Sequence, residues 1–214
     1  MTDNRDADVD DDALMRAFAQ GDARAFERLY ARHHAALYRF LRRVLGREAG
    51  TQADEVFQDT WLRVVHARER WSPQGATFRT WLFTLGHRRA IDQLRKSGRE
   101  VSLDVGDEAG EPWQPASDAA AWQAWPAAVD SVAAATAEER AFWRAAGQRL
   151  LDCLDMLPAA QRSAFLLHHE DGLALEDLAR ALEVGFETAK SRLRYAMSKL
   201  RTCMGAYLPQ GQSS

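Results

Sequence analysis

Residues 172–195 read GLALEDLARALEVGFETAKSRLRY and predict two short helices joined by a tight turn. The first helix has an apolar face, because leucine and alanine recur there at helical spacing: Leu175, Leu178, Ala179 and Leu182. Gly185 supplies the backbone freedom that a sharp turn needs, and Thr188 is the expected N-cap of the second helix. Two helices packed across such a turn are typical of a helix-turn-helix motif.

The second helix of this motif is predicted to be apolar on one side and polar on the other. The apolar side holds Ala189, Leu193, Ala196, Met197 and Leu200, and the polar side and its flank hold Thr188, Lys190, Ser191, Arg194 and Tyr195. From Thr188 to the last residue there is no acid, but there are five cations: Lys190, Arg192, Arg194, Lys199 and Arg201. Such a helix can lie in the major groove of DNA and contact phosphates. The alternative is a solvated face on an ordinary helical hairpin.

Composition places the chain among proteins with one or two domains. It has 214 residues, 46% of them hydrophobic, and a net charge of −3, which excludes a uniformly basic DNA-coating protein. Residues 100–142 carry nine acids against one arginine, whereas basic residues gather in residues 78–99 and in the last predicted helix. This asymmetry favours nucleic-acid surfaces separated by a solvated linker.

The two cysteines, Cys153 and Cys203, form no CxxC and have no metal-like spacing. We therefore expect no disulfide framework, and a reducing cytoplasm fits the chain. The acidic N-terminus lacks the apolar core of a signal peptide, and no apolar run reaches the length of a membrane span.

The N-terminal half predicts four helices. Asp10–Asp12 suit the start of the first, Gly21-Asp22 break the chain after it, and Gly46 is the expected C-cap of the second. Asp54 is expected to open the third helix. Its inward residues are predicted to be Val56, Phe57, Trp61, Leu62, Val64 and Val65, and its outward residues Glu55, Gln58, Asp59 and Arg63. The outward stripe fits either a solvated face or a docking face for another protein.

The fourth helix is predicted from about Phe78 to Lys96, ending at Ser97-Gly98. Arginines and aromatic residues alternate along it, a pattern that suits melted nucleic acid because bases stack on rings while arginines hold phosphates. The alternative is that the apolar residues are core, which is favoured for Trp81. Trp71 and Phe78, beside the loop that contains Pro73, are the better candidates for base contact.

Residues 100 to about 137 are expected to be a flexible acidic linker, because proline and acids leave too little apolar surface to order it. Three tryptophans there, Trp113, Trp122 and Trp125, either dock loosely on a domain or contact a partner. Helices are expected again from about Ala137 to Leu157 and over Gln161–His168, before the helix-turn-helix. The predicted fold class is all-α: a four-helix N-terminal domain and a C-terminal helix-turn-helix domain, with few contacts between them.

Catalytic patterns are weak in this chain. The adjacent pairs His33-His34 and His168-His169 point about 100° apart on a helix, so neither makes a natural two-ligand metal site. A phosphate-binding glycine loop, a GxSxG elbow and an HExxH motif are all missing from the sequence. No enzyme activity, metal or cofactor is expected.

Together these motifs resemble bacterial RNA polymerase sigma factors of the extracytoplasmic-function (ECF) group, in the sigma-70 family. Residues 26–30 with 37–41 look like the start of the family's first domain, and residues 54–64 (DEVFQDTWLRV) look like its polymerase-docking helix. Residues 78–83 and 90–95 look like the helix that opens and reads the −10 promoter element. Residues 157–162 (LPAAQR) and 187–193 (ETAKSRL) look like the domain that reads the −35 element. Arg88 departs from the pattern, since many members have Asn there.

The resemblance implies a role for each surface. It implies polymerase binding by Asp54, Glu55, Gln58, Asp59 and Arg63. It implies −10 contacts by Trp71, Phe78, Arg79, Arg88, Arg89, Asp92, Arg95 and Arg99. It implies −35 contacts by Thr188, Lys190, Ser191, Arg192, Arg194 and Tyr195.

The resemblance also implies a domain order and a set of partners. The order is an acidic tail (1–12), a region 2-like domain (13–99), the linker (100–140), a region 4-like domain (141–206) and a tail (207–214). Core RNA polymerase, promoter DNA and an anti-sigma protein would be the partners, in the cytoplasm and without membrane insertion. Two other classes fit the sequence less well: a stand-alone helix-turn-helix regulator, which leaves residues 54–99 unexplained, and an enzyme such as a recombinase, which needs a catalytic constellation that residues 13–99 lack.

Overall fold

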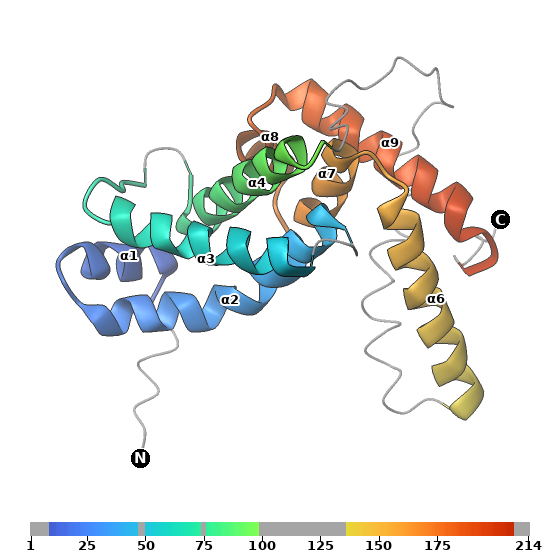
Figure 1. The fold of residues 1–214 in the computed structure, drawn as a ribbon, viewed down its shortest axis with the longest axis horizontal. Helices are drawn as coiled ribbons and strands as arrows, with labels where there is room; N and C mark the ends of the chain where they lie inside the picture. The colour runs from blue at the N-terminus through green and yellow to red at the C-terminus, as the bar shows by residue number, and fades with distance from the viewer. Residues whose placement is uncertain (1–8, 47–49, 74–75, 99–135, 208–214) are drawn as a thin grey trace.

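The computed structural model describes residues 9–46, 50–73, 76–98 and 136–207, and every regular element in these ranges is helical (Figure 1). The N-terminal domain is built from α1 (Asp11–Ala19), α2 (Ala23–Leu45), α3 (Gly50–Ala67) and α4 (Phe78–Lys96). The C-terminal domain contains α6 (Ala137–Asp155), α7 (Ala159–His169), α8 (Leu175–Leu182), α9 (Phe186–Met204) and the short 3-10 turn η3 (Gly205–Tyr207). The all-α prediction is confirmed. Residues 99–135, which include most of the predicted linker and its three tryptophans, lie outside the described residues.

Local capping explains most helix boundaries. The Asp10 carboxylate caps α1 by accepting from the backbone N–H groups of Asp12 and Ala13, and Asp22 caps α2 in the same way. Gly46, with φ 84°, ends α2 as predicted. Thr136 and Glu139 form a capping box at the start of α6, which begins at Ala137 as the helical pattern predicted, so residues 137–140 are helical although the domain order implied by the resemblance placed them in the linker.

Two boundaries differ from the prediction. α3 begins at Gly50, four residues before Asp54, which was expected to open it. The left-handed residue of the helix-turn-helix turn is Glu183 (φ 56°), whereas Gly185 has φ −64° and serves as the N-cap of α9. Thr188 therefore lies inside the first turn of α9 and does not cap it.

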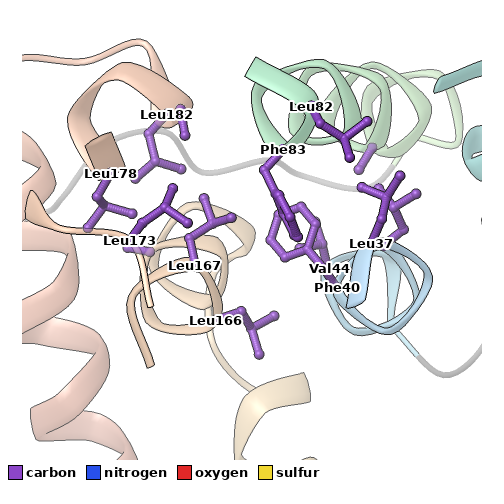
Figure 2. Packing of buried hydrophobic residues seen from close by; sticks show 14 of the residues in the cluster. Leu37, Phe40, Val44, Leu82, Phe83, Leu166, Leu167, Leu173, Leu178 and Leu182 are labelled. Carbon is purple, nitrogen blue, oxygen red and sulfur yellow. The ribbon is translucent and has the colours of Figure 1, made fainter. Parts of the chain in front are cut away.

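The two domains pack against each other, so the expectation of few mutual contacts is wrong. α4 lies alongside α8, and α2 meets α7, as Figure 1 shows. Buried residues of both domains form one hydrophobic cluster, in which Phe40 of α2 and Phe83 of α4 belong to one domain and Leu166 and Leu167 of α7 to the other (Figure 2). Burying apolar area of this kind stabilises the docked arrangement.

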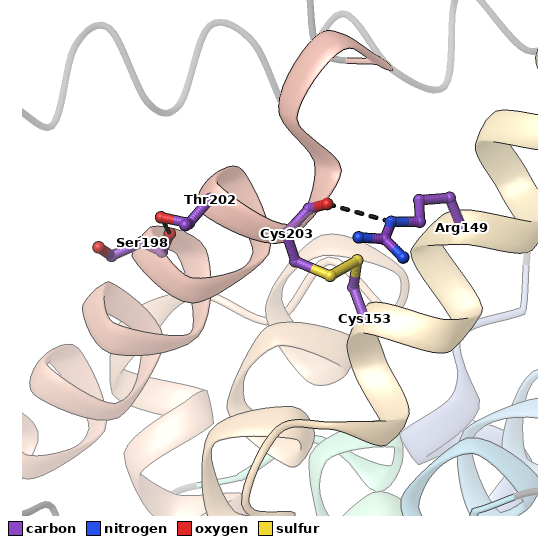
Figure 3. The surroundings of a disulfide bond; sticks show 5 residues. All are labelled: Arg149, Cys153, Ser198, Thr202 and Cys203. Atoms are coloured by element: carbon purple, nitrogen blue, oxygen red, sulfur yellow. Dashed lines mark hydrogen bonds between the residues drawn. A yellow bond between two sulfur atoms is a disulfide. The ribbon is translucent and has the colours of Figure 1, made fainter.

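Cys153 of α6 and Cys203 of α9 form a disulfide, which corrects the expectation of no disulfide framework (Figure 3). The Arg149 guanidinium donates to the Cys203 carbonyl beside it, at 3.1 Å. The pair is 50 residues apart in sequence, and sequence alone does not show that α6 packs against α9. Closing a loop of that length stabilises the bonded chain by about 3–4 kcal/mol relative to the reduced one.

Candidate DNA and polymerase interfaces

The predicted docking face of α3 is exposed. Glu55, Gln58 and Arg63 all face solvent, and Asp54 at its edge accepts a hydrogen bond from the Tyr38 hydroxyl at 2.7 Å. Leu62 corrects the prediction, because it was expected to pack inward but its side chain is 56% exposed. It follows Glu55 and Gln58 by seven and four residues, a spacing that places all three on one helix face. That spacing was the signal available in the sequence.

Asp59 belongs to the same predicted set but has structural partners. Its carboxylate pairs with Arg63 one turn along α3, at 3.0 Å, and with Arg89 of α4. Burial would raise the pKa of Asp59, but the hydrogen bond from Arg63 and the charge of Arg89 together hold that pKa below its usual value. Asp59 thus joins α3 to α4.

Phe78, predicted to contact a base, is a core residue. Its ring has no exposed surface, and its backbone N–H donates to the Asp12 carboxylate at 2.6 Å. Trp71 is half-buried and packs on the rings of Phe78 and Trp81, with 6.4 Å between centroids in each case. Of the two predicted aromatic contacts, Trp71 alone retains solvent-accessible surface.

The arginines predicted for the −10 element fall into different environments. Arg88 is exposed and makes a two-armed ion pair with Glu183 of the other domain, which raises the pKa of Arg88. Arg89 is partly buried and pairs with Asp59 and, at 3.4 Å, with Asp92. Asp92, implied by the resemblance for −10 contact, therefore has Arg89 of the same helix as a structural partner.

The remaining members of this set are placed as follows. Arg95 is exposed near the end of α4. Arg79 lies over the Phe83 ring, 5.9 Å from its centroid. Arg99 lies outside the described residues.

α9 presents its predicted −35 residues on an accessible surface, with one exception. Thr188 is exposed, and Lys190, Ser191, Arg194 and Tyr195 are partly exposed. The Arg194 guanidinium stacks 4.7 Å from the Tyr195 ring centroid, which holds both side chains together. Arg192 is the exception, because it is 6% exposed and turned toward α4. Phe186, which the sequence reasoning missed, is 41% exposed in the first turn of α9.

The histidine pairs have structural partners. His33 contacts the Asp11 carboxylate at 2.6 Å, which lowers the pKa of Asp11, and His168 contacts the Leu173 carbonyl at 2.8 Å. Among the described residues, no three His, Cys, Asp or Glu side chains converge as a metal site would require. Within the same ranges, no helix has both the length and the apolar character to cross a bilayer.

Comparison with known proteins decides the family. The Sigma-70 region 2 family matches residues 29–100, and the Sigma-70 region 4 family matches residues 147–200. The ECF RNA polymerase sigma factor SigK of Mycolicibacterium vanbaalenii is 34% identical over 194 residues, which cover 91% of this chain and 89% of the relative. SigK of Mycobacterium tuberculosis strain H37Ra is 30% identical over 90% of this chain and 92% of its own length. The chain belongs to the ECF group of RNA polymerase sigma factors.

Two solved structures share the fold of this sigma factor. CnrH, in complex with the cytosolic domain of CnrY, has a TM-score of 0.59 and 25% identity, with coverage of 90% of this chain and 96% of CnrH. RpoE of Bartonella quintana, in complex with the anti-sigma factor NepR, has a TM-score of 0.57 and 22% identity, with coverage of 85% and 97%.

Family membership establishes the general function. This sigma factor is a promoter-specificity subunit of RNA polymerase, and the alternative of a stand-alone regulator is not favoured. Sigma factors of this family are generally initiation factors without enzymatic activity.

Proposed function

We propose that this sigma factor binds core RNA polymerase through the exposed face of α3. The observation that carries the proposal is Leu62, a large apolar side chain left 56% exposed between the polar residues Gln58 and Arg63. An apolar anchor within a polar rim is the usual anatomy of a protein interface. Glu55 and Asp54 extend the polar rim. Asp59 has a structural role, because its ion pairs with Arg63 and Arg89 fix α3 against α4.

The first experiment tests this docking face. Tagged chain is used to capture purified core polymerase. Leu62→Asp should lower the affinity at least tenfold, because it places a charge where the anchor must be desolvated. Met156→Asp is the matched control, since Met156 is 65% exposed but lies in the other domain. Equal capture by Leu62→Asp and the unaltered chain would show that α3 does not dock through this residue.

The two domains are proposed to read the two promoter elements. The region 2-like domain (13–99) would engage the melted −10 element through Trp71, Asp92 and the arginines of α4, because arginine with an aromatic platform suits single-stranded DNA. The region 4-like domain (141–206) would place the start of α9 in the major groove at the −35 element, with Lys190, Ser191, Arg194 and Tyr195 nearest the bases. Thr188 and Phe186, exposed in the same turn, would flank them.

We also propose where this sigma factor acts and which kind of partner restrains it. Such a subunit works where polymerase and DNA are, which in a bacterium is the cytoplasm. It would have no catalytic activity of its own. CnrH and RpoE were solved in complex with CnrY and NepR, the latter an anti-sigma factor, which supports a partner of that kind for this chain. The partner would restrain initiation by covering the polymerase- and DNA-binding faces.

A further inference from the structure

The helix-turn-helix domain is seated on the same helix that carries the proposed −10 residues. α8 runs alongside α4, and α7 packs into the side of α2. Figure 2 shows Leu167 of α7 between the α8 residues Leu178 and Leu182 and the α2–α4 pair Phe40 and Phe83, and all five belong to one buried cluster. The apolar contact between the domains is therefore continuous with the core of each.

The first of two ion pairs across this contact joins Arg88 to Glu183. Arg88 Nε donates a hydrogen bond to one carboxylate oxygen of Glu183, and Arg88 Nη2 donates to the other. Glu183 is the one non-glycine residue with positive φ in the described ranges, a backbone conformation that L residues adopt at a cost. This conformation places the Glu183 carboxylate against Arg88 of α4.

The second pair joins Arg43 of α2 to Glu170, the residue that ends α7. Its side chains are 31% and 28% exposed, less than those of Arg88 and Glu183, so solvent screens the pair less. Asp171 follows in sequence, is 5% exposed, and feels the charges of Arg39, Arg43 and Arg79 from the N-terminal domain. Acids of one domain thus face cations of the other at two separate points.

This docking occupies part of both proposed DNA surfaces. Arg88 is committed to Glu183, and Arg192 of α9 is turned inward. Asp92 and Arg95 line a cavity of about 400 Å³ between α4 and the helix-turn-helix. DNA and the C-terminal domain cannot both occupy this side of α4.

The docked arrangement also cannot span a promoter. Elements centred 25 base pairs apart are about 85 Å apart along B-form DNA. α4 has 19 residues, so it is about 28 Å long, and it is in contact with α8. Residues 99–135, which join the domains, could bridge the promoter distance, since an extended chain of that length reaches about 120 Å. Reading both elements therefore requires the domains to separate.

We infer that this chain restrains itself: without any partner it rests in a closed form, latched by the Arg88–Glu183 and Arg43–Glu170 pairs, in which the C-terminal domain competes with DNA for α4. The inference rests on the proposed −10 role of α4. Only the open fraction can bind a promoter, so the apparent affinity falls in proportion to that fraction. Loss of either ion pair should therefore raise the open fraction and the apparent promoter affinity together.

Single-molecule energy transfer on the full chain tests closure. Dyes are attached through unnatural amino acids at Lys96 and Glu176, exposed positions on the adjacent helices α4 and α8, which leaves the cysteines unaltered. The chain alone should give one high-transfer population. Arg43→Glu and Glu170→Arg, neither of which is in a proposed DNA or polymerase surface, should each raise the low-transfer fraction roughly tenfold, because reversal replaces attraction by repulsion. The double variant that carries both Arg43→Glu and Glu170→Arg should restore the high-transfer population.

A control variant and a second charge swap complete the experiment. Glu27→Arg makes the same charge change at an exposed position near the start of α2 and should leave the transfer histogram unchanged. Glu183→Arg paired with Arg88→Glu repeats the swap at the other latch, and circular dichroism confirms that each variant stays folded. A chain that is open on its own, or single reversals that leave it closed, would overturn the inference. Transcription by the unaltered chain is scored separately, so a closed chain that supports no transcription would instead contradict the proposed function.

Discussion

His87 lies where α4 meets the helix-turn-helix, and its imidazole is 7% exposed. Burial lowers the pKa of His87 to about 4, and the nearby cations Arg192 and Arg88 act in the same direction. The folded protein therefore holds a neutral ring that the unfolded chain would protonate below about pH 6.5. Its contribution to stability is full at neutral pH and is lost as the pH falls toward 4.

The loss of stability at lower pH can be measured by urea unfolding at pH 7 and at pH 5.5. The unaltered chain should lose on the order of 1 kcal/mol more stability over this interval than His87→Gln does. His169, whose pKa burial also lowers to about 4, and Asp171, whose pKa burial raises to about 7, cancel in the comparison because both chains keep them. The exposed His34→Gln variant should behave like the unaltered chain. An identical pH slope for His87→Gln would contradict the buried neutral ring.

Arg194 is the residue best placed to test −35 readout, because its side chain is held over Tyr195 near the start of α9. Arg194→Ala should weaken binding to a −35 duplex, selected by the protein from a random library, by about 1–3 kcal/mol. Lys199→Ala, exposed farther along α9, is the control. Equal weakening on selected and scrambled duplexes would make Arg194 a phosphate contact with no role in base readout.

The burial of a single residue was predicted well where the periodicity of its own helix decides it, and poorly where a distant segment packs over the residue. Periodicity correctly separated the apolar side of α9, but Arg192 was misjudged because its burial depends on α4, a distant segment. Phe78 was misjudged because its ring packs against His33 of α2, a residue distant in sequence, and against Trp71 and Trp81. Leu62 was misjudged because an apolar residue was assumed to be inward.

At the scale of elements, α4 is the central helix of the N-terminal domain, and Gly86 permits its close approach to α2. A Cβ atom at Gly86 would lie 2.9 Å from Leu37 Cδ1 and 3.4 Å from Leu41 Cδ2. Gly147 in α6 is the opposite case, since a Cβ there meets nothing within 4 Å. The two glycines form a matched pair.

Gly86→Val should therefore lower the free energy of unfolding by about 1–3 kcal/mol, because the added methyl groups overpack a close helix crossing. Gly147→Ala should raise it by about 0.5–1 kcal/mol through helix propensity alone. Urea unfolding followed by circular dichroism measures both. If Gly86→Val were as stable as the unaltered chain, the close packing of α4 on α2 would be wrong.

Elements with capping signals were predicted closely. α4 runs from Phe78 to Lys96 as expected, because Thr77 caps its start and Ser97-Gly98 end it. α3 was predicted to start late, with Asp54 as its first residue, whereas the helix already runs from Gly50. The left-handed turn residue was placed at Gly185 by its chemistry, yet Glu183 adopts that conformation where it meets Arg88.

At the scale of the whole molecule, two features follow from contacts that no local pattern reveals. The order of the motifs predicted two helical domains and their family, and both predictions are confirmed. The docking of α8 on α4 and the Cys153–Cys203 bond join segments tens of residues apart, so neither could be predicted from periodicity or spacing.

This sigma factor is proposed to direct core RNA polymerase to promoters whose −10 element it helps to open. Run-off transcription with purified core polymerase on a library of host promoters tests this proposal most directly, with permanganate reactivity of thymines as the measure of opening. Specific transcripts and reactive −10 thymines are expected only when the sigma factor and core polymerase are both present, and Leu62→Asp should greatly reduce both signals. If core polymerase and the unaltered chain together gave no specific transcript from any promoter in the library, this sigma factor would not direct initiation as proposed.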